Sequence, residues 1–142
     1  MNKLAIIIPT RDRSKELVKL LFSIRSQDIV PQQTVIVDSS KMPNETIVQE
    51  FSDLNIVYKY TQPPSLTKQR NVGLSLLRKD IELVIFFDDD IVLCPSALKI
   101  MLDFWESALP KVGGVVFNII NERSGRLWWL KQIFFTGCKK PG

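Results

Sequence analysis

The chain repeats one pattern, in which a short and wholly apolar run is followed by a segment with helical periodicity. The first run, Leu4–Ile8, ends at Pro9. Runs of the same kind recur at Thr34–Val37, Ile56–Tyr60, Leu83–Phe87 and Val112–Ile120. Because a run without polar alternation needs cover on both of its faces, each one predicts a strand inside a parallel sheet.

Helical patterns lie between these runs. In Ser14–Ser26 the apolar side chains recur with helical spacing and share one face. Further helical patterns cover Glu45–Phe51, Leu66–Leu77 and Pro95–Leu109, where Pro95 suits a first helical turn. Strands that alternate with helices predict a doubly wound α/β fold, with a mostly parallel sheet and helices on both of its faces. Such folds bind ligands beyond the carboxyl ends of their strands.

The composition excludes several kinds of catalytic and metal site. The chain of 142 residues suits one domain and has no apolar stretch long enough to cross a bilayer. Its start resembles a strand more than a signal peptide, so we expect a cytoplasmic location. Histidine is absent, which excludes Ser-His and Cys-His mechanisms and histidine zinc sites and leaves carboxylates as the candidate bases and metal ligands. Cys94 and Cys138 have no CxxC spacing and are expected to be buried or incidental thiols and not a redox pair.

Polar residues follow three of the predicted strands. Pro9-Thr10-Arg11-Asp12-Arg13 follows the first strand, Asp38-Ser39-Ser40 the second and Asp88-Asp89-Asp90 the fourth. Because parallel strands end at one rim, we expect these residues to converge on one crevice. Three consecutive acids repel one another unless a cation balances them. Carboxylate oxygens suit Mg²⁺ or Mn²⁺, which share their coordination with substrate phosphates.

Each of these residues has a simpler alternative interpretation. The acidic triplet also suits a solvated turn before the next helix, but its place after a wholly apolar strand favours the metal site. Asp38 can contact a nucleotide or cap its own turn. Lys68 and Arg70 can bind phosphate or lie in solvent, and Arg11 taken singly is more typical of a surface charge.

Four segments in order resemble the signatures of the family-2 nucleotide-sugar glycosyltransferases. They are Ile6 to Arg13, Val35 to Ser40, Lys68 to Gly73 and Phe86 to Asp90, and the resemblance covers about residues 3–120. It implies a Rossmann-like GT-A fold of the nucleotide-diphospho-sugar transferases. It also implies an inverting transfer from a nucleotide-diphosphate sugar to an acceptor hydroxyl. We therefore predict a nucleotide-sugar-binding α/β domain at residues 1–120.

The resemblance also implies roles for single residues. Pro9 and Thr10 match the floor of the nucleotide site, Asp38 the acid that contacts the base, and Arg70 a donor-binding arginine. Arg11 and Lys68 are further donor-binding candidates. In the DxD-type triplet, Asp90 is favoured as the ligand of a divalent Mn²⁺ or Mg²⁺ ion. Asp88 is favoured for the ribose side and is the second metal candidate, and Asp89 suits either role.

The remaining residues, 121–142, are predicted to begin an acceptor-side region of a truncated chain. No carboxylate base matches there, and it is expected beyond Gly142. The aromatic and basic segment Arg126–Phe135 suits either a peripheral contact at the inner face of the membrane or packing against the rest of the protein. The predicted partners are the donor and a glycan or lipid-linked acceptor, with no nucleic acid. The alternatives are an inactive donor-binding fragment and a nucleotidyltransferase, although the first loop lacks the glycines of the latter. A receiver-like signalling domain is disfavoured, because such domains carry an acidic pair after the first strand and a single aspartate after a later one, which is the opposite of the layout in this chain.

Overall fold

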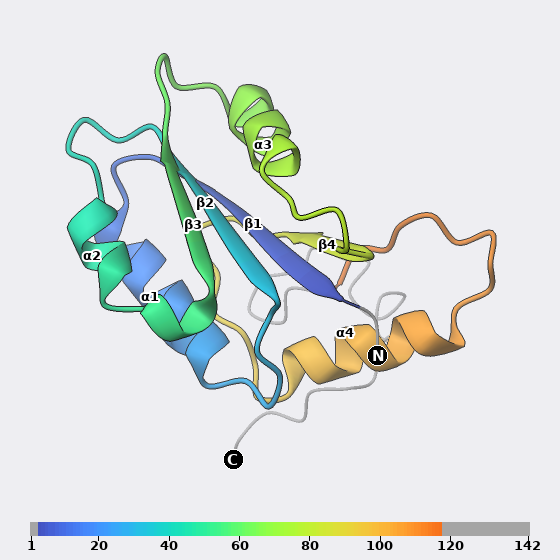
Figure 1. Cartoon of the computed structure of the whole chain (residues 1–142). Helices are drawn as coiled ribbons and strands as arrows, with labels where there is room; N and C mark the ends of the chain where they lie inside the picture. The colour runs from blue at the N-terminus through green and yellow to red at the C-terminus, as the bar shows by residue number, and fades with distance from the viewer. Residues whose placement is uncertain (1–2, 118–142) are drawn as a thin grey trace, which may run out of the picture.

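A computed structural model of the protein describes residues 3–117. Its centre is a four-stranded sheet of β1 (Leu4–Thr10), β2 (Gln33–Asp38), β3 (Ile56–Tyr60) and β4 (Leu83–Phe86). The strand order is β3-β2-β1-β4 and every neighbouring pair is parallel, as Figure 1 shows. The prediction of a parallel sheet is therefore confirmed. All four strands end at one rim, where the polar loops also lie.

Strand β1 lies between β2 and β4, and all seven of its residues are buried. Successive side chains of a strand point to opposite faces. Ile6 and Ile8 accordingly join the core on one side of the sheet, while Ile7 joins the core on the other. A central strand covered in this way requires an apolar run without alternation, which is the pattern that predicted it.

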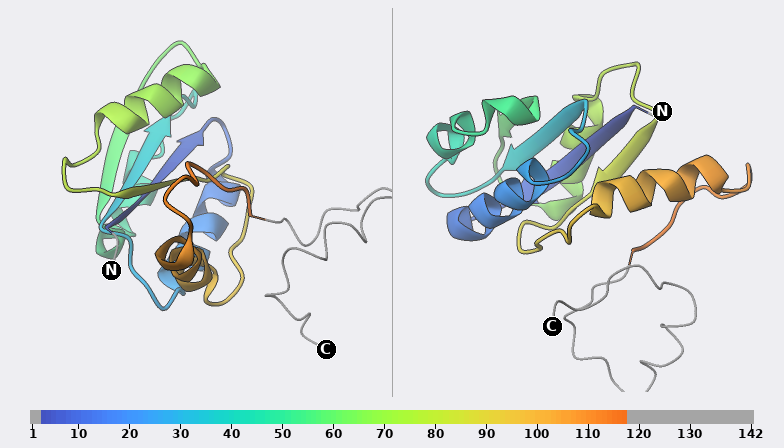
Figure 2. Two further views of the ribbon diagram at one scale, coloured as in Figure 1. Left: turned by 90° about the vertical axis from the view of Figure 1, so that its right-hand side faces the viewer. Right: turned by 90° about the horizontal axis from the view of Figure 1, so that it is seen from below.

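Helices cover both faces of the sheet. Helices α1 (Ser14–Arg25), α2 (Glu45–Gln49) and α4 (Ala97–Ser107) contribute apolar side chains to the larger core. A short 3₁₀ turn, η1 (Ser52–Leu54), also contributes to this core. Helix α3 (Leu66–Ser75) and the turn after it cover the opposite face. The two views in Figure 2 show the sheet between α3 and the layer that contains α1 and α4.

One predicted helix start and one predicted strand are wrong. Pro95 does not begin a helix, because Ser96 has a left-handed backbone with φ of 58° and α4 begins at Ala97. The predicted strand Val112–Ile120 does not form over residues 112–117, and its last three residues lie outside the described part. The apolar run there contains Gly113 and Gly114, which weaken a strand. Within residues 3–117, no helix has both the length and the apolar character needed to cross a bilayer.

Candidate functional site

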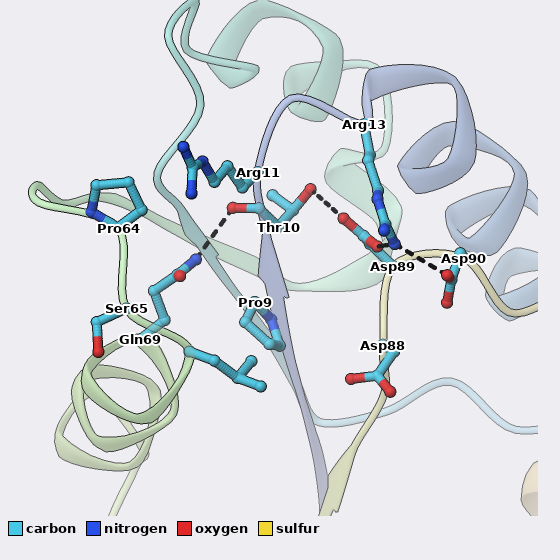
Figure 3. Close-up of a pocket in the computed structure, with 11 residues that line it drawn as sticks. Pro9, Thr10, Arg11, Arg13, Pro64, Ser65, Gln69, Asp88, Asp89 and Asp90 are labelled. Carbon is cyan, nitrogen blue, oxygen red and sulfur yellow. Dashed lines mark hydrogen bonds and ion pairs between the residues drawn. The ribbon is translucent and has the colours of Figure 1, made fainter.

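A pocket of about 460 Å³ opens at the rim where β1 and β4 end and α3 begins. Figure 3 shows its walls. The side that comes from β1, its following loop and the end of β4 consists of Pro9, Thr10, Arg11, Arg13 and the triplet Asp88, Asp89 and Asp90. The α3 side consists of Pro64, Ser65, Leu66 and Gln69. The structure thus brings six of the predicted site residues together, although Asp38, Lys68 and Arg70 do not line this pocket.

The three acids differ in their surroundings. Asp89 is buried, with 6% of its surface exposed. The side chains of Asp88 and Asp90 are 62% and 52% exposed. Thr10 Oγ1 donates a hydrogen bond of 2.8 Å to Asp89 Oδ2. Asp89 therefore connects the end of β4 to the end of β1, while its two neighbours present their carboxylates toward solvent.

Arg13 balances part of this negative charge. Its Nη1 atom lies 3.1 Å from Asp89 Oδ1 and 2.9 Å from Asp90 Oδ2. The hydrogen bond to Asp89 and the charges of both acids raise the pKa of the Arg13 guanidinium. Sequence reasoning treated Arg13 as part of a motif and assigned it no role. Its place in the loop that shares a rim with the acids was the available signal.

Asp12 fixes the loop that carries the two arginines. It has a left-handed backbone with φ of 53°, which aspartate tolerates better than most residues. Its amide donates to Ser40 Oγ, and its Oδ1 accepts from the amide of Lys41. The loops after β1 and β2 are therefore joined. Arg11 Nε lies 3.7 Å from Asp12, and the exposed Arg11 side chain faces the pocket without an ion pair to the triplet within residues 3–117.

Asp38 is completely buried beside the pocket loops. Its Oδ1 accepts from the Ser40 amide, and its Oδ2 accepts from the Asn44 amide, the Asn44 side chain and Tyr58 Oη. Burial by itself raises the pKa of Asp38, but the hydrogen bonds from Ser40, Tyr58 and Asn44 outweigh it and hold that pKa below its usual value. These contacts favour the turn-capping interpretation of Asp38. Contact with a nucleotide base stays a prediction.

Helix α3 is held against the sheet by two buried residues. The Gln69 side chain is 4% exposed and donates to the backbone carbonyls of Thr10 and Val37, at the ends of β1 and β2. Gly73 lies directly over Ile7 of β1. Ser65 caps the helix by accepting from the Lys68 amide. The first turn of α3, with the partial positive charge of a helix N-terminus, faces the pocket through Ser65, Leu66 and Gln69.

Arg70 and Lys68 lie on other sides of the same helix. Arg70 Nη2 is 3.2 Å from Asp88 Oδ1, and its guanidinium lies 5.7 Å from the centre of the Phe86 ring. Arg70 Nε is buried and has no hydrogen-bond partner within residues 3–117. Lys68 Nζ donates to the Gln62 carbonyl instead of an acid. Arg70 is thus beside the triplet, whereas Lys68 stabilises the loop before α3.

The pocket offers carboxylate oxygens to a metal ion, but the described residues do not supply a complete set of ligands. Within the described residues, no group of three or more His, Cys, Asp or Glu side chains is arranged to hold an ion. The exposed carboxylates of Asp88 and Asp90 are the available hard ligands. Two carboxylates completed by water and phosphate oxygens are a typical Mg²⁺ environment. The side chains present therefore fit a divalent ion that binds together with a phosphate ligand.

Comparison with known proteins identifies the family. Residues 5–141 match the family model described as Glycosyl transferase family 2. The chain therefore belongs to glycosyl transferase family 2. It is 31% identical to a GalNAc(5)-diNAcBac-PP-undecaprenol beta-1,3-glucosyltransferase of Campylobacter jejuni, over 89% of this chain and 41% of that protein.

Solved structures show the same fold. TarS of S. aureus superposes with a TM-score of 0.65 and 29% identity over 73% of this chain and 19% of that one. The structure of TarS 1-349 in complex with UDP-GlcNAc gives a TM-score of 0.63 at 29% identity, again over 73% of this chain and over 31% of that one. The Rossmann-like GT-A prediction is thereby confirmed. The chain spans less than half the length of each of these relatives.

Proposed function

We propose that this chain is the donor-binding part of a glycosyltransferase that moves a sugar from a nucleotide-diphosphate sugar to an acceptor hydroxyl with inversion. The observation that carries the proposal is the pocket itself. It joins residues of separate sequence motifs, Pro9 to Arg13, Gln69 and the acidic triplet, at the carboxyl rim of a parallel sheet. Binding at this rim is the general rule for open α/β sheets. The TarS structures with UDP and UDP-GlcNAc support a uridine nucleotide as the first donor to test.

The charges around the pocket suit a diphosphate. Arg11 and Arg13 line it on one side, and the first turn of α3 lines it on the other. Cationic side chains and helix N-termini both stabilise phosphate oxygens. In this arrangement Pro9 and Thr10 form the floor for the nucleotide. Asp38 supports the loop after β2 through its hydrogen bonds, and its proposed contact with the base requires a movement of that loop, because Asp38 is fully buried.

The proposed metal ligands are Asp90 and Asp88. They carry the exposed carboxylates of the triplet, whereas both oxygens of Asp89 already accept hydrogen bonds from Thr10 and Arg13. A divalent Mn²⁺ or Mg²⁺ ion supplies positive charge that stabilises the leaving diphosphate when bound. Arg70, adjacent to Asp88, adds a second cation near the same group. Lys68 donates to the Gln62 carbonyl and not to the triplet, so its proposed contribution is to hold the loop before α3 in place.

The proposed reaction is a single displacement. The acceptor oxygen forms a bond to the anomeric carbon while the bond from that carbon to the diphosphate oxygen breaks, and a base accepts the hydroxyl proton. Pocket residues of this chain hold the leaving group in line and offset the charge that develops on it. The base is assigned to no residue of the described structure.

The acceptor is proposed to be a glycan, including a lipid-linked one. The supporting observation is the name of the Campylobacter jejuni relative, a glucosyltransferase acting on an undecaprenol-linked glycan. A peripheral membrane contact through Arg126–Phe135 belongs to this proposal, and that segment lies outside the described residues. Flotation with anionic liposomes tests it. Absence of binding by the full-length protein removes the membrane contact from the proposal.

Calorimetry with Mn²⁺ and a panel of nucleotide sugars tests donor binding. We expect at least one uridine-diphosphate sugar to bind, with an affinity that falls on removal of metal and in Asp90→Asn. Asp103→Asn is the matched control, because Asp103 is an exposed acid paired with Lys99 on α4, away from the pocket. Binding that is indifferent to metal and to Asp90→Asn would refute the metal assignment. Failure of every nucleotide sugar to bind would refute the donor site.

The inactive donor-binding fragment is the second candidate, because the chain spans 41% of its glucosyltransferase relative. A transfer assay separates the two. If the chain binds donor with metal but releases no sugar to any acceptor, while a longer protein that contains it does, the chain is a binding part only. The family assignment favours both of these functions over a nucleotidyltransferase.

A further inference from the structure

A single nitrogen of Arg13 bridges two acids of the triplet. Arg13 Nη1 lies within hydrogen-bond distance of Asp89 Oδ1 and Asp90 Oδ2, as Figure 3 shows. Asp89 also accepts from Thr10, so it keeps a partner if Arg13 moves away. Within residues 3–117, the Asp90 side chain accepts a hydrogen bond from Arg13 and from no other residue. The carboxylate proposed to bind metal is therefore the one that Arg13 now pairs with, through its Oδ2 atom.

The position of Arg13 is unfavourable for local helix stability. Arg13 is the N-cap residue of α1, where it makes no side-chain capping hydrogen bond. Short polar residues stabilise this position, and a cation is repelled by the partial positive charge of the helix start. The nearby acids offset that repulsion. A cation here is explained by the triplet that it neutralises, and not by the helix that it precedes.

The Arg13 side chain is free to move while its backbone stays fixed. Its carbonyl accepts the first hydrogen bond of α1, from the Leu17 amide, at 3.0 Å. Its side chain is 53% exposed and lines the pocket. Rotation about the side-chain bonds therefore suffices to carry the guanidinium from Asp90 to another anion in the pocket. Guanidinium groups bind phosphate oxygens as readily as carboxylates.

We propose that Arg13 is the internal counter-cation of the acidic triplet and competes with the divalent metal for Asp90. This inference rests on the proposed donor and metal site. Metal that binds Oδ2 of Asp90 without a donor displaces Arg13 and leaves it without its Asp90 partner. Metal that arrives with a diphosphate meets a site where Arg13 has a second anion to bind. Arg13 thus acts as a positioning residue that couples metal binding to donor binding, and the coupling is reciprocal by linkage.

Calorimetry of Mn²⁺ alone and of Mn²⁺ with saturating UDP measures this coupling. For the wild-type chain we expect UDP to tighten Mn²⁺ binding on the order of tenfold. For Arg13→Gln we expect Mn²⁺ alone to bind on the order of tenfold tighter than to wild type, and the effect of UDP to shrink. Arg11→Gln is the matched control, since it removes the same charge from the same pocket without a contact to the triplet in the described structure.

The outcomes separate the two proposals. If wild type binds Mn²⁺ with UDP but Arg13→Gln binds Mn²⁺ no tighter than wild type, Arg13 is not a competitor and the inference fails alone. If Arg11→Gln tightens Mn²⁺ as much as Arg13→Gln, general charge explains the effect and the inference also fails. If no variant binds Mn²⁺ with or without UDP, the proposed metal site fails as well.

A measurement on the wild-type chain covers the case in which Arg13→Gln does not fold. The Nε–H signal of Arg13, assigned by its change in Arg13→Lys, is followed by NMR during addition of Mg²⁺, of UDP and of both. We expect the largest change with both ligands together, because only then does the guanidinium exchange Asp90 for phosphate. A signal that does not respond to the combination overturns the inference.

Discussion

At Gly73, helix α3 packs closely against Ile7 of strand β1, and this contact helps to set the position of the helix beside the pocket. A Cβ atom added at Gly73 would lie 2.5 Å from Ile7 Cγ2. That separation is far below the 3.5–4.0 Å at which two carbon atoms are most stable. Ile7 is fully buried in the central strand, and its branched side chain has few alternative rotamers. The helix, and not Ile7, must therefore move in Gly73→Ala.

Two opposing effects set the magnitude. Overpacking in a well-packed core costs roughly 1–3 kcal/mol, and the severity of this contact points to the upper end. Alanine is more stable than glycine in a helix interior by up to about 1 kcal/mol. We expect Gly73→Ala to lower the free energy of unfolding by about 2 kcal/mol, the difference of the two terms. For a domain of this size the melting temperature then falls by roughly 4–10 °C.

Urea unfolding followed by circular dichroism measures this loss, and UDP calorimetry measures its effect on the pocket. Because Gln69 and the first turn of α3 move with the helix, UDP binding should weaken as well. Asn71→Ala is the control, since it makes a similar helix-favouring change at an exposed position of α3. A Gly73→Ala chain as stable as wild type, or stabilised like Asn71→Ala, would refute the close-approach reasoning.

Three further predictions concern the hydrogen bonds around the site. Asp38→Asn should lower the free energy of unfolding by about 2–4 kcal/mol at neutral pH, because an amide nitrogen then faces buried donors. Since the pKa of Asp38 is depressed in the folded state, its stabilisation is present above its unfolded pKa and is lost as pH falls through the folded pKa, so the stabilities of the two chains should begin to approach each other below about pH 4 and converge only at lower pH. Gln69→Leu should cost about 1–3 kcal/mol by removing two buried hydrogen bonds to strand-end carbonyls, whereas Gln49→Leu on the exposed side of α2 should cost much less in the same denaturation assay. Thr10→Val should destabilise the chain by about 1–2 kcal/mol through loss of the hydrogen bond to Asp89, and Thr10→Ser should restore most of it; equal melting temperatures for the two variants would contradict the role of the hydroxyl.

The strands were predictable because the sheet is covered on both faces. Burial on both faces demands apolar runs, so Ile56–Tyr60 agrees with its prediction and the other three strands agree within two residues at each end. The start of α4 was less predictable. Pro95 favours a first helical turn, but a left-handed Ser96 turns the chain before the helix begins. Such a backbone reversal depends on packing of the flanking segment and leaves no periodic signal.

The site was predictable at the level of loops, and less so at the level of side chains. Parallel topology is sufficient to bring Thr10 and the acidic triplet to one rim. Which partner each side chain chooses depends on long-range geometry. Asp12 and Ser40, for example, are 28 residues apart in the sequence, and no local spacing rule predicts a hydrogen bond over such a separation. Arg13 and Gln69 were therefore missed as partners of the acids and of the strand ends.

The surroundings of the three acids set the order of roles within the triplet. Three identical residues give a sequence no register, and β4 itself ends at Phe86, with Asp89 and Asp90 in the turn that follows. Phe86 is exposed, Phe87 is buried, and the alternation continues through an exposed Asp88, a buried Asp89 and an exposed Asp90. The hydrogen bond from Thr10 holds the buried Asp89 inward, whereas the side chains of Asp88 and Asp90 face outward. A substitution that changed which of the three acids is buried would therefore alter the proposed metal site, even if it removed no carboxylate.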